Sequence, residues 1–202
     1  MDSLQNSLQF KITNKQILKL TLPVSIAILV PQLNFITNNI FLGHYSTTTL
    51  AVASITGVYY LIFASIGFAL NNGLLALISR RAGENRPDEI GKIFNQGIFT
   101  ALLISAVAVI LSYTITPTIL RSILHEPEKA EMAISFIQIR IWGLPFLYIY
   151  QLRNALLVGT NQSKYMVMGT AAEAVANVVF DYTLIFGKWG MPELGFNGAG
   201  YP

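Results

Sequence analysis

Residues 91–116 read GKIFNQGIFTALLISAVAVILSYTIT, and this stretch contains no charged side chain after Lys92. An α-helix needs about 20 apolar residues to cross the hydrocarbon core of a bilayer, which is about 30 Å thick. A membrane β-strand would instead show about ten residues of alternating polarity. The stretch therefore predicts a membrane-spanning helix.

The rest of the chain has the same character. Of its 202 residues, 53% are hydrophobic and 11% are charged, whereas soluble domains carry roughly 25% charged residues. So few charges cannot cover the surface of a soluble enzyme, and a disordered chain would need low hydrophobicity. The chain has no cysteine, which excludes a disulfide framework, a thiolate metal site and a cysteine nucleophile. The class that remains is a polytopic membrane protein.

Five stretches are long and apolar enough to span a bilayer. The prediction is an all-α, polytopic transmembrane helix bundle with spans at 17–42, 48–79, 91–116, 132–158 and 165–186. Residues from about 195 onward, GFNGAGYP, suit the start of a sixth helix, because small residues let membrane helices approach closely. Residues 1–16 precede the first span, and within them 3–14 fit either a short amphipathic surface helix or a frayed terminus.

The lysines and arginines of the loops predict the orientation, since cytoplasmic loops carry an excess of them. With Arg140 left aside inside the fourth span, nine cationic residues lie on the side of the amino terminus and three on the other side. We therefore expect a multi-pass protein of the cell membrane, with residues 1–16 in the cytoplasm and residue 202 near the outer face.

Three polar residues distinguish the fifth span, namely Glu173, Asn177 and Asp181. Steps of four residues stay near one face of a helix, so the three side chains form one polar stripe. Ionised carboxylates are costly inside a membrane unless they are paired or bind a cation. The stripe indicates a site that couples to H⁺ or Na⁺ at Asp181, with Glu173 as a second carboxylate. Alternatively, Asp181 is solvated near the outer interface, and Glu173 forms a structural pair with an arginine or lysine.

Amide side chains mark the first span. We expect Gln32, Asn34 and Asn38 to line a cavity inside the bundle, together with Tyr150 of the fourth span. The amides would hydrogen-bond a substrate there, or else bond one helix to another. Tyrosines in membrane proteins also lie in interfacial belts or in the core.

Pro23, Pro31 and Pro145 are expected to kink their helices, because proline removes a backbone donor. Proline is also common in membrane helices for packing alone. Arg140 is expected to extend outward to the membrane surface, or else to pair with an acid of the fifth span.

Motifs for other chemistry are missing from the sequence. It has no P-loop and no dinucleotide-binding glycine motif, so we expect no ATPase, no cofactor and no nucleic-acid partner. His44 and His125 stand alone in predicted loops, so we expect no metal site beyond Na⁺ at Asp181. The expected partners are the lipid bilayer and small organic substrates.

Short motifs in order along the chain resemble the amino-terminal half of the MATE (multidrug and toxic compound extrusion) family of transporters. They lie at helix ends, in one loop and in the fifth span. They are NNIFLG (38–43), LAVA (50–53), SRRAGEN (79–85), GLPF (143–146), residues 152–161, NVVFDY (177–182), IFG (185–187) and GFNGA (195–199).

The resemblance implies a protein of twelve helices in two lobes, which exchanges Na⁺ or H⁺ for cationic or amphipathic compounds by alternating access. Residues 17–202 would form the amino-terminal lobe, and the second lobe would be missing. In many members this lobe binds the coupling cation, at positions that correspond here to Asn177, Asp181 and Asn38. The family has an acid where Asn38 stands, so we hypothesise that Glu173 supplies the missing carboxylate.

Two other functions are compatible with the helix pattern. A lipid-linked oligosaccharide flippase of the same superfamily would need several cationic residues in its cavity, and only Arg140 is a candidate. A membrane-embedded enzyme acting on lipid would need paired acids or histidines at one membrane face, which the sequence lacks. A scaffold role would leave the polar stripe of the fifth span unexplained.

Overall fold

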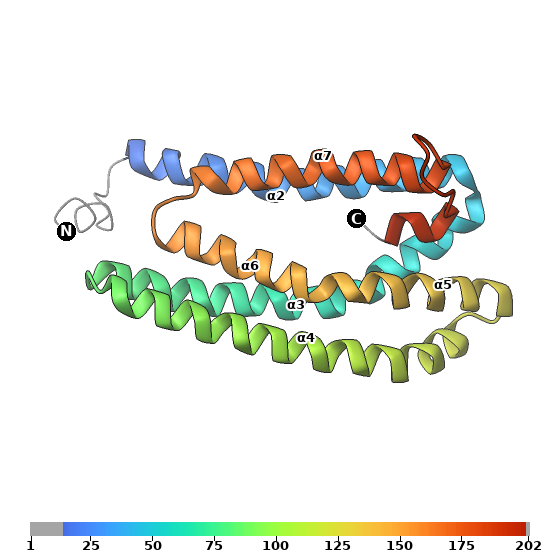
Figure 1. Ribbon diagram of the computed structural model, residues 1–202, viewed down its shortest axis with the longest axis horizontal. Helices are drawn as coiled ribbons and strands as arrows, with labels where there is room; N and C mark the ends of the chain where they lie inside the picture. The colour runs from blue at the N-terminus through green and yellow to red at the C-terminus, as the bar shows by residue number, and fades with distance from the viewer. Residues whose placement is uncertain (1–13, 201–202) are drawn as a thin grey trace.

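The computed structural model describes residues 14–200, and in α2 the side chains of Pro23, Pro31 and Gln32 lie outside the described residues. Every regular element in the described range is helical, as the sequence predicts (Figure 1). The elements in chain order are α2 (Asn14–Tyr45), α3 (Thr47–Gly83), α4 (Pro87–Ile123), α5 (Pro127–Arg140), the 3₁₀ helix η1 (Ile141–Gly143), α6 (Leu144–Gly159), α7 (Lys164–Phe186) and the 3₁₀ helix η2 (Gly195–Gly200).

Local chemistry explains where these helices begin and end. The Ser46 hydroxyl caps α3 by accepting a hydrogen bond from the backbone N–H of Thr48, at 3.2 Å, which satisfies a donor that the helix leaves free. Pro87 occupies the first position of α4, where its missing N–H costs nothing. Gly187 ends α7 with φ +62°, a left-handed conformation that glycine adopts without strain.

Two predicted boundaries differ from the structure. The predicted third span ends before Pro117, but α4 continues through this proline to Ile123. Neighbouring helices and side chains make proline tolerable in a membrane helix, so Pro117 is a poor stop signal here. The predicted fourth span, 132–158, comprises α5, η1 and α6, with the one-turn η1 directly before α6 and Pro145 near its start.

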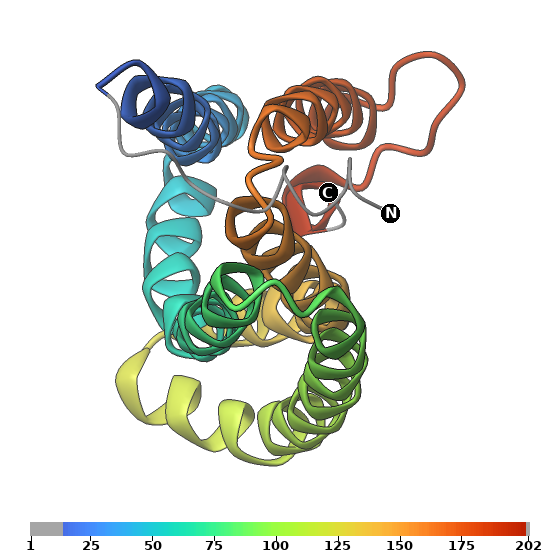
Figure 2. The same ribbon diagram turned by 90° about the vertical axis from the view of Figure 1, so that its left-hand side faces the viewer.

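The helices form two groups (Figure 1, Figure 2). In one, α2 and α7 pack along each other, and in the other, α3 packs against α4 and α6. The segment η2 contacts α2, α5 and α7, and Phe196 stacks on Phe136 of α5 with 4.4 Å between ring centroids. The segment η2 therefore joins α2 and α7 to α5 at one end of the bundle. Residues 195–200 form a 3₁₀ helix, and a sixth spanning helix stays a prediction.

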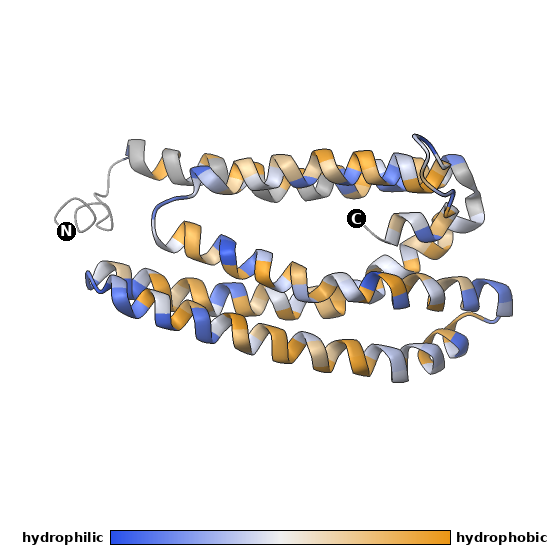
Figure 3. Ribbon diagram, in the orientation of Figure 1, coloured by the Kyte–Doolittle hydropathy of each residue, from blue (hydrophilic) through white to orange (hydrophobic). Residues whose placement is uncertain are grey.

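Apolar side chains cover much of the outer surface, as in a protein surrounded by lipid. Phe99, Leu103 and Ile110 of α4 are more than half exposed. Hydrophilic residues gather at the turn between α3 and α4 and at the connection from α6 to α7, which lie at the same end of the bundle, while the middle of α4 is mostly hydrophobic (Figure 3). A soluble protein would bury such side chains.

Three stretches in the described range are long and apolar enough to cross a membrane, Thr48–Gly83, Pro87–Ile123 and Pro127–Gly159. The helix α7 matches the predicted fifth span closely. It is not among these three stretches, because its polar stripe lowers its mean hydropathy. For α2, several side chains lie outside the described residues. The count of five spanning helices therefore stays a prediction.

Candidate functional site

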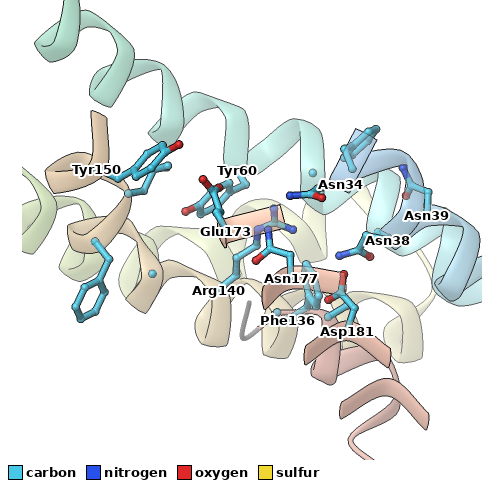
Figure 4. A pocket seen from close by; sticks show the side chains of 18 of the residues that line it. Asn34, Asn38, Asn39, Tyr60, Phe136, Arg140, Tyr150, Glu173, Asn177 and Asp181 are labelled. Atoms are coloured by element: carbon cyan, nitrogen blue, oxygen red, sulfur yellow. The ribbon is translucent and has the colours of Figure 1, made fainter. Parts of the chain in front are cut away.

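A cavity of about 610 Å³ lies between the α2/α7 pair and the other helices (Figure 4). Residues of α2, α3, α5, η1, α6, α7 and η2 line it, and no residue of α4 does. Along α7 the lining extends from Gly169 to Asp181, which is a rise of about 18 Å along a helix. The cavity therefore follows the bundle axis for much of the thickness of a bilayer core.

One wall of the cavity is the polar face of α7. Its lining residues are Gly169, Glu173, Asn177 and Asp181, each four positions after the last. A step of four on a regular helix drifts only slightly around the axis, so the sequence spacing alone places them on one face. The structure shows that this face is directed into the cavity.

The two carboxyl groups of this wall each keep an unpaired oxygen. Asp181 is only 3% exposed, and its Oδ1 has no hydrogen-bond partner among the described residues. The Oε2 atom of Glu173 is likewise buried and unpaired in the described part of the chain. Among the side chains that the structure describes, no lysine, arginine or histidine nitrogen lies within 4.0 Å of either carboxylate. A buried charge without a partner is costly, so this wall is a candidate place for a bound cation.

The α2 wall adds amides. Asn34, Asn38 and Asn39 line the cavity, opposite or beside the α7 stripe (Figure 4). The Nδ2 atom of Asn34 is buried and has no hydrogen-bond partner in the described range. The cavity thus offers carboxylate oxygens from α7 and amide groups from both α2 and α7.

A guanidinium lies at the third wall. The Cζ atom of Arg140 is 4.7 Å from the ring centroid of Tyr60 on α3 and 5.8 Å from that of Phe136 on α5. All three side chains line the cavity. The expectation that Arg140 extends outward to the membrane surface is wrong, because these aromatic faces hold its guanidinium inside. It forms no ion pair within 4.0 Å with an acid of α7 either.

A second guanidinium lies further along α6. Arg153 lines the cavity, with its Cζ atom 5.6 Å from the Tyr150 ring centroid. Its Nη2 donates to the backbone carbonyl of Tyr165 on α7, at 3.4 Å. The hydroxyl groups of Tyr150 and Thr170 also share a hydrogen bond, at 2.9 Å. These contacts join α6 to α7.

The structure brings most of the predicted site residues to this one cavity, namely Asn34, Asn38, Tyr150, Glu173, Asn177 and Asp181. The side chain of Gln32 lies outside the described residues. Pro23 and Pro31 fall within α2, which is helical across both positions. Pro145 lies at the start of α6, next to the break at η1.

Sequence reasoning missed Arg153, the position of Tyr60 beside Arg140, and the inward direction of Arg140. The sequence does contain a signal for Arg153. Cavity-lining residues recur every three or four positions from Arg140 to Arg153, namely Arg140, Gly143, Phe146, Leu147, Tyr150 and Arg153. This is the spacing of one helical face. No comparable signal links Tyr60 to Arg140, since they belong to helices far apart in sequence.

The fold and the site define a class: a helical membrane protein with apolar outer faces and an internal cavity that carries buried polar groups. Intramembrane ionisable residues of this kind mark ion and substrate pathways. The MatE family profile matches residues 23–183. The chain belongs to this family, the MATE transporters that its motifs resemble.

Named relatives agree with this assignment. The chain is 29% identical over 190 residues to a probable multidrug resistance protein NorM of Halalkalibacterium halodurans, covering 91% of this chain and 41% of the relative. It is 27% identical over 192 residues to the multidrug resistance protein MdtK of Pectobacterium atrosepticum, covering 95% and 42%. The chain therefore spans less than half the length of these relatives.

Solved structures share the fold. A MATE protein crystallised with MaD3S superposes with a TM-score of 0.85 at 19% identity, covering 93% of this chain and 41% of that one. An outward-facing MATE family transporter of the MOP superfamily gives a TM-score of 0.82 at 20% identity, with the same coverage of 93% and 41%. These relatives are transporters, whereas none of these names describes an enzyme.

Proposed function

We propose that this chain forms the amino-terminal lobe of a secondary active multidrug efflux transporter of the cell membrane, with its amino terminus in the cytoplasm. The transporter would export cationic or amphipathic compounds by antiport with Na⁺ or H⁺ through alternating access. The second lobe, which the full-length relatives have room for, would complete the transport path.

The observation that carries the proposal is the α7 wall, where buried and unpaired oxygens of Glu173 and Asp181 face a cavity also lined by α2 amides. Asp181 is the coupling carboxylate, and it binds H⁺ or Na⁺ in one conformation and releases it in the other. A cation can bias the two conformations only by its difference in affinity for them. Asn177 is its neighbour on the stripe, and Glu173 replaces the acid that the family has at the position of Asn38.

The first test is the size of the native product. Membranes are blotted with an antibody against residues 80–92, and a band near twice 22.3 kDa supports a two-lobe transporter. A band near 22.3 kDa requires the chain to dimerise, and a monomer of that size contradicts the proposal.

The second test is coupling. In cells expressing the protein from its own locus, Asp181→Asn should abolish ethidium efflux driven by an imposed H⁺ or Na⁺ gradient, since an amide cannot exchange either ion. Asp88→Asn, at the first turn of α4 and outside the cavity, is the matched control and should retain efflux. Unchanged efflux in Asp181→Asn would show that this carboxylate does not couple transport.

A lipid-linked oligosaccharide flippase is a second candidate, because the cavity contains Arg153 in addition to Arg140, and paired guanidinium groups suit a pyrophosphate. Two observations weigh against it. Glu173 and Asp181 line the same cavity and would repel a pyrophosphate when ionised, and Arg153 already donates to a backbone carbonyl. The named relatives are multidrug resistance proteins.

A further inference from the structure

Arg140 occupies a place that has the properties of a binding site for an organic cation. Its guanidinium lies within 6 Å of two aromatic centroids, 4.7 Å from Tyr60 and 5.8 Å from Phe136. This is the range in which a cation gains from the electron-rich face of a ring. The two rings come from different helices, so the tertiary fold and not the local sequence makes the place.

The guanidinium is held there without the usual partners. An arginine has five N–H donors, yet the Arg140 side chain makes no hydrogen bond or ion pair with any group that the structure describes. Arg153 provides a contrast, because it donates to the Tyr165 carbonyl and packs against Gly169. The two aromatic faces are therefore the direct contacts of the Arg140 guanidinium, and Asp181 of α7 attracts it from beyond ion-pair distance.

A tethered cation affects every cation that enters the cavity. It is always present at high effective concentration, and it repels a second positive charge at short range. A quaternary ammonium from solution would have to displace it from Tyr60 and Phe136 before binding there. Cations that enter the cavity are therefore expected to bind at the wall that carries Glu173 and Asp181.

We propose that Arg140 is a specificity-determining residue: its guanidinium fills an aromatic cation site made by Tyr60 and Phe136, and so excludes quaternary ammonium compounds from that part of the cavity. The inference rests on the proposed function only in taking this cavity as the substrate cavity. Removal of the guanidinium opens the aromatic site to a ligand from solution.

The test is binding of tetraethylammonium to the full chain in lipid nanodiscs, measured by calorimetry without an ion gradient. Arg140→Met keeps an apolar stem and removes the charge, and it should bind tetraethylammonium about tenfold more tightly than the wild type, as a partly desolvated cation–π contact allows. Arg140→Gln, a second neutral variant, should show a gain in the same direction. Arg140→Lys retains a tethered cation and should bind like the wild type.

Two controls separate the aromatic site from simple relief of charge. Arg153→Met removes a positive charge from the same cavity and should gain less than threefold. The double variant Arg140→Met with Tyr60→Leu should lose the gain, because it lacks the Tyr60 ring, the nearer of the two aromatic faces. The proposal is overturned if neutral variants at 140 bind no better than the wild type, if the double variant retains the gain, or if Arg153→Met gains as much. Since no gradient is used, failure of antiport coupling would leave this result intact.

Discussion

The hydroxyl of Tyr148 on α6 donates a hydrogen bond to the backbone carbonyl of Phe63 on α3, with 2.8 Å between the two oxygens. The side chain of Tyr148 is fully buried, and its ring lies directly over Gly67, one turn further along α3. The close approach of α3 and α6 therefore depends on a residue without a side chain.

Gly67→Ala should destabilise the bundle. A Cβ atom at this position would lie 2.7 Å from Cδ1 of Tyr148, and the ring cannot move away without losing its bond to Phe63. Overpacking of this kind costs about 1–3 kcal/mol. The apparent melting temperature of the purified chain in detergent measures the effect.

Gly73→Ala on the same helix is the matched control, because no described atom beyond its own stretch of helix lies within 4 Å of its Cβ position. Alanine is favoured over glycine inside a helix by about 1 kcal/mol, so this variant should be as stable as the wild type or more so. Equal melting temperatures for the two variants would show that the Tyr148 ring tolerates the methyl group.

Glu173→Gln should remove ion coupling, if this carboxylate replaces the acid that the family has at Asn38. The amide has the same size but cannot bind H⁺ or balance Na⁺. In cells expressing the native protein, gradient-driven ethidium efflux should fall at least tenfold.

Asn38→Asp in the Glu173→Gln background provides the decisive comparison. Both positions line one cavity, so an acid at 38 should restore most of the efflux. Undiminished efflux in Glu173→Gln, or a lack of rescue by Asn38→Asp, would refute the hypothesis that Glu173 supplies the acid that the family has at position 38.

The charged turn between α3 and α4 should make stability depend on pH. Hydrogen bonds from Arg81 and then Arg80 hold the pKa of Glu84 below its ordinary value of 4.5. A carboxyl whose pKa is lowered by folding stabilises the protein above its ordinary pKa, and this contribution is lost as the pH falls through the lowered value. The wild type should therefore melt at a higher temperature than Glu84→Gln at pH 7, and the difference should shrink below pH 4.5.

Salt provides the check on that interpretation. Both arginine–Glu84 pairs are partly exposed to solvent, so 1 M NaCl should also reduce the difference through screening. A difference that is constant across pH and salt would assign the effect of Glu84→Gln to packing instead of charge.

Gly198→Ala should displace η2. A Cβ atom there would lie 2.7 Å from the carbonyl carbon and oxygen of Leu184, and a backbone group in α7 cannot rotate away as a side chain can. The shift should break the stacking of Phe196 on Phe136, and the variant should lose about 1–3 kcal/mol, measured by thermal unfolding. Gly200→Ala, whose Cβ would be 3.4 Å from side-chain atoms, should lose less.

The sequence predicted the features that depend on local order. The steps of four from Glu173 to Asp181 place these residues on one face because helix geometry is regular, and the apolar stretches predict helices for the same reason. Arg140 shows the limit. Its direction depends on Tyr60, a residue of another helix, and no local pattern contains that information. Similarly, Pro117 reads as a stop signal, whereas packing keeps α4 helical through it. The role of the α7 stripe in ion coupling stays a prediction.

The absence of α4 from the cavity wall has a practical consequence. Its outer residues Phe99, Leu103 and Ile110 are exposed and are not among the residues that line the cavity. In a variant with Trp142 and Trp189 replaced by phenylalanine, since both native tryptophans are exposed, a tryptophan at any of these positions would report on contact with brominated lipids through quenching of its fluorescence. Such a reporter would measure the depth and tilt of the lobe in the bilayer during transport while leaving its chemistry unaltered.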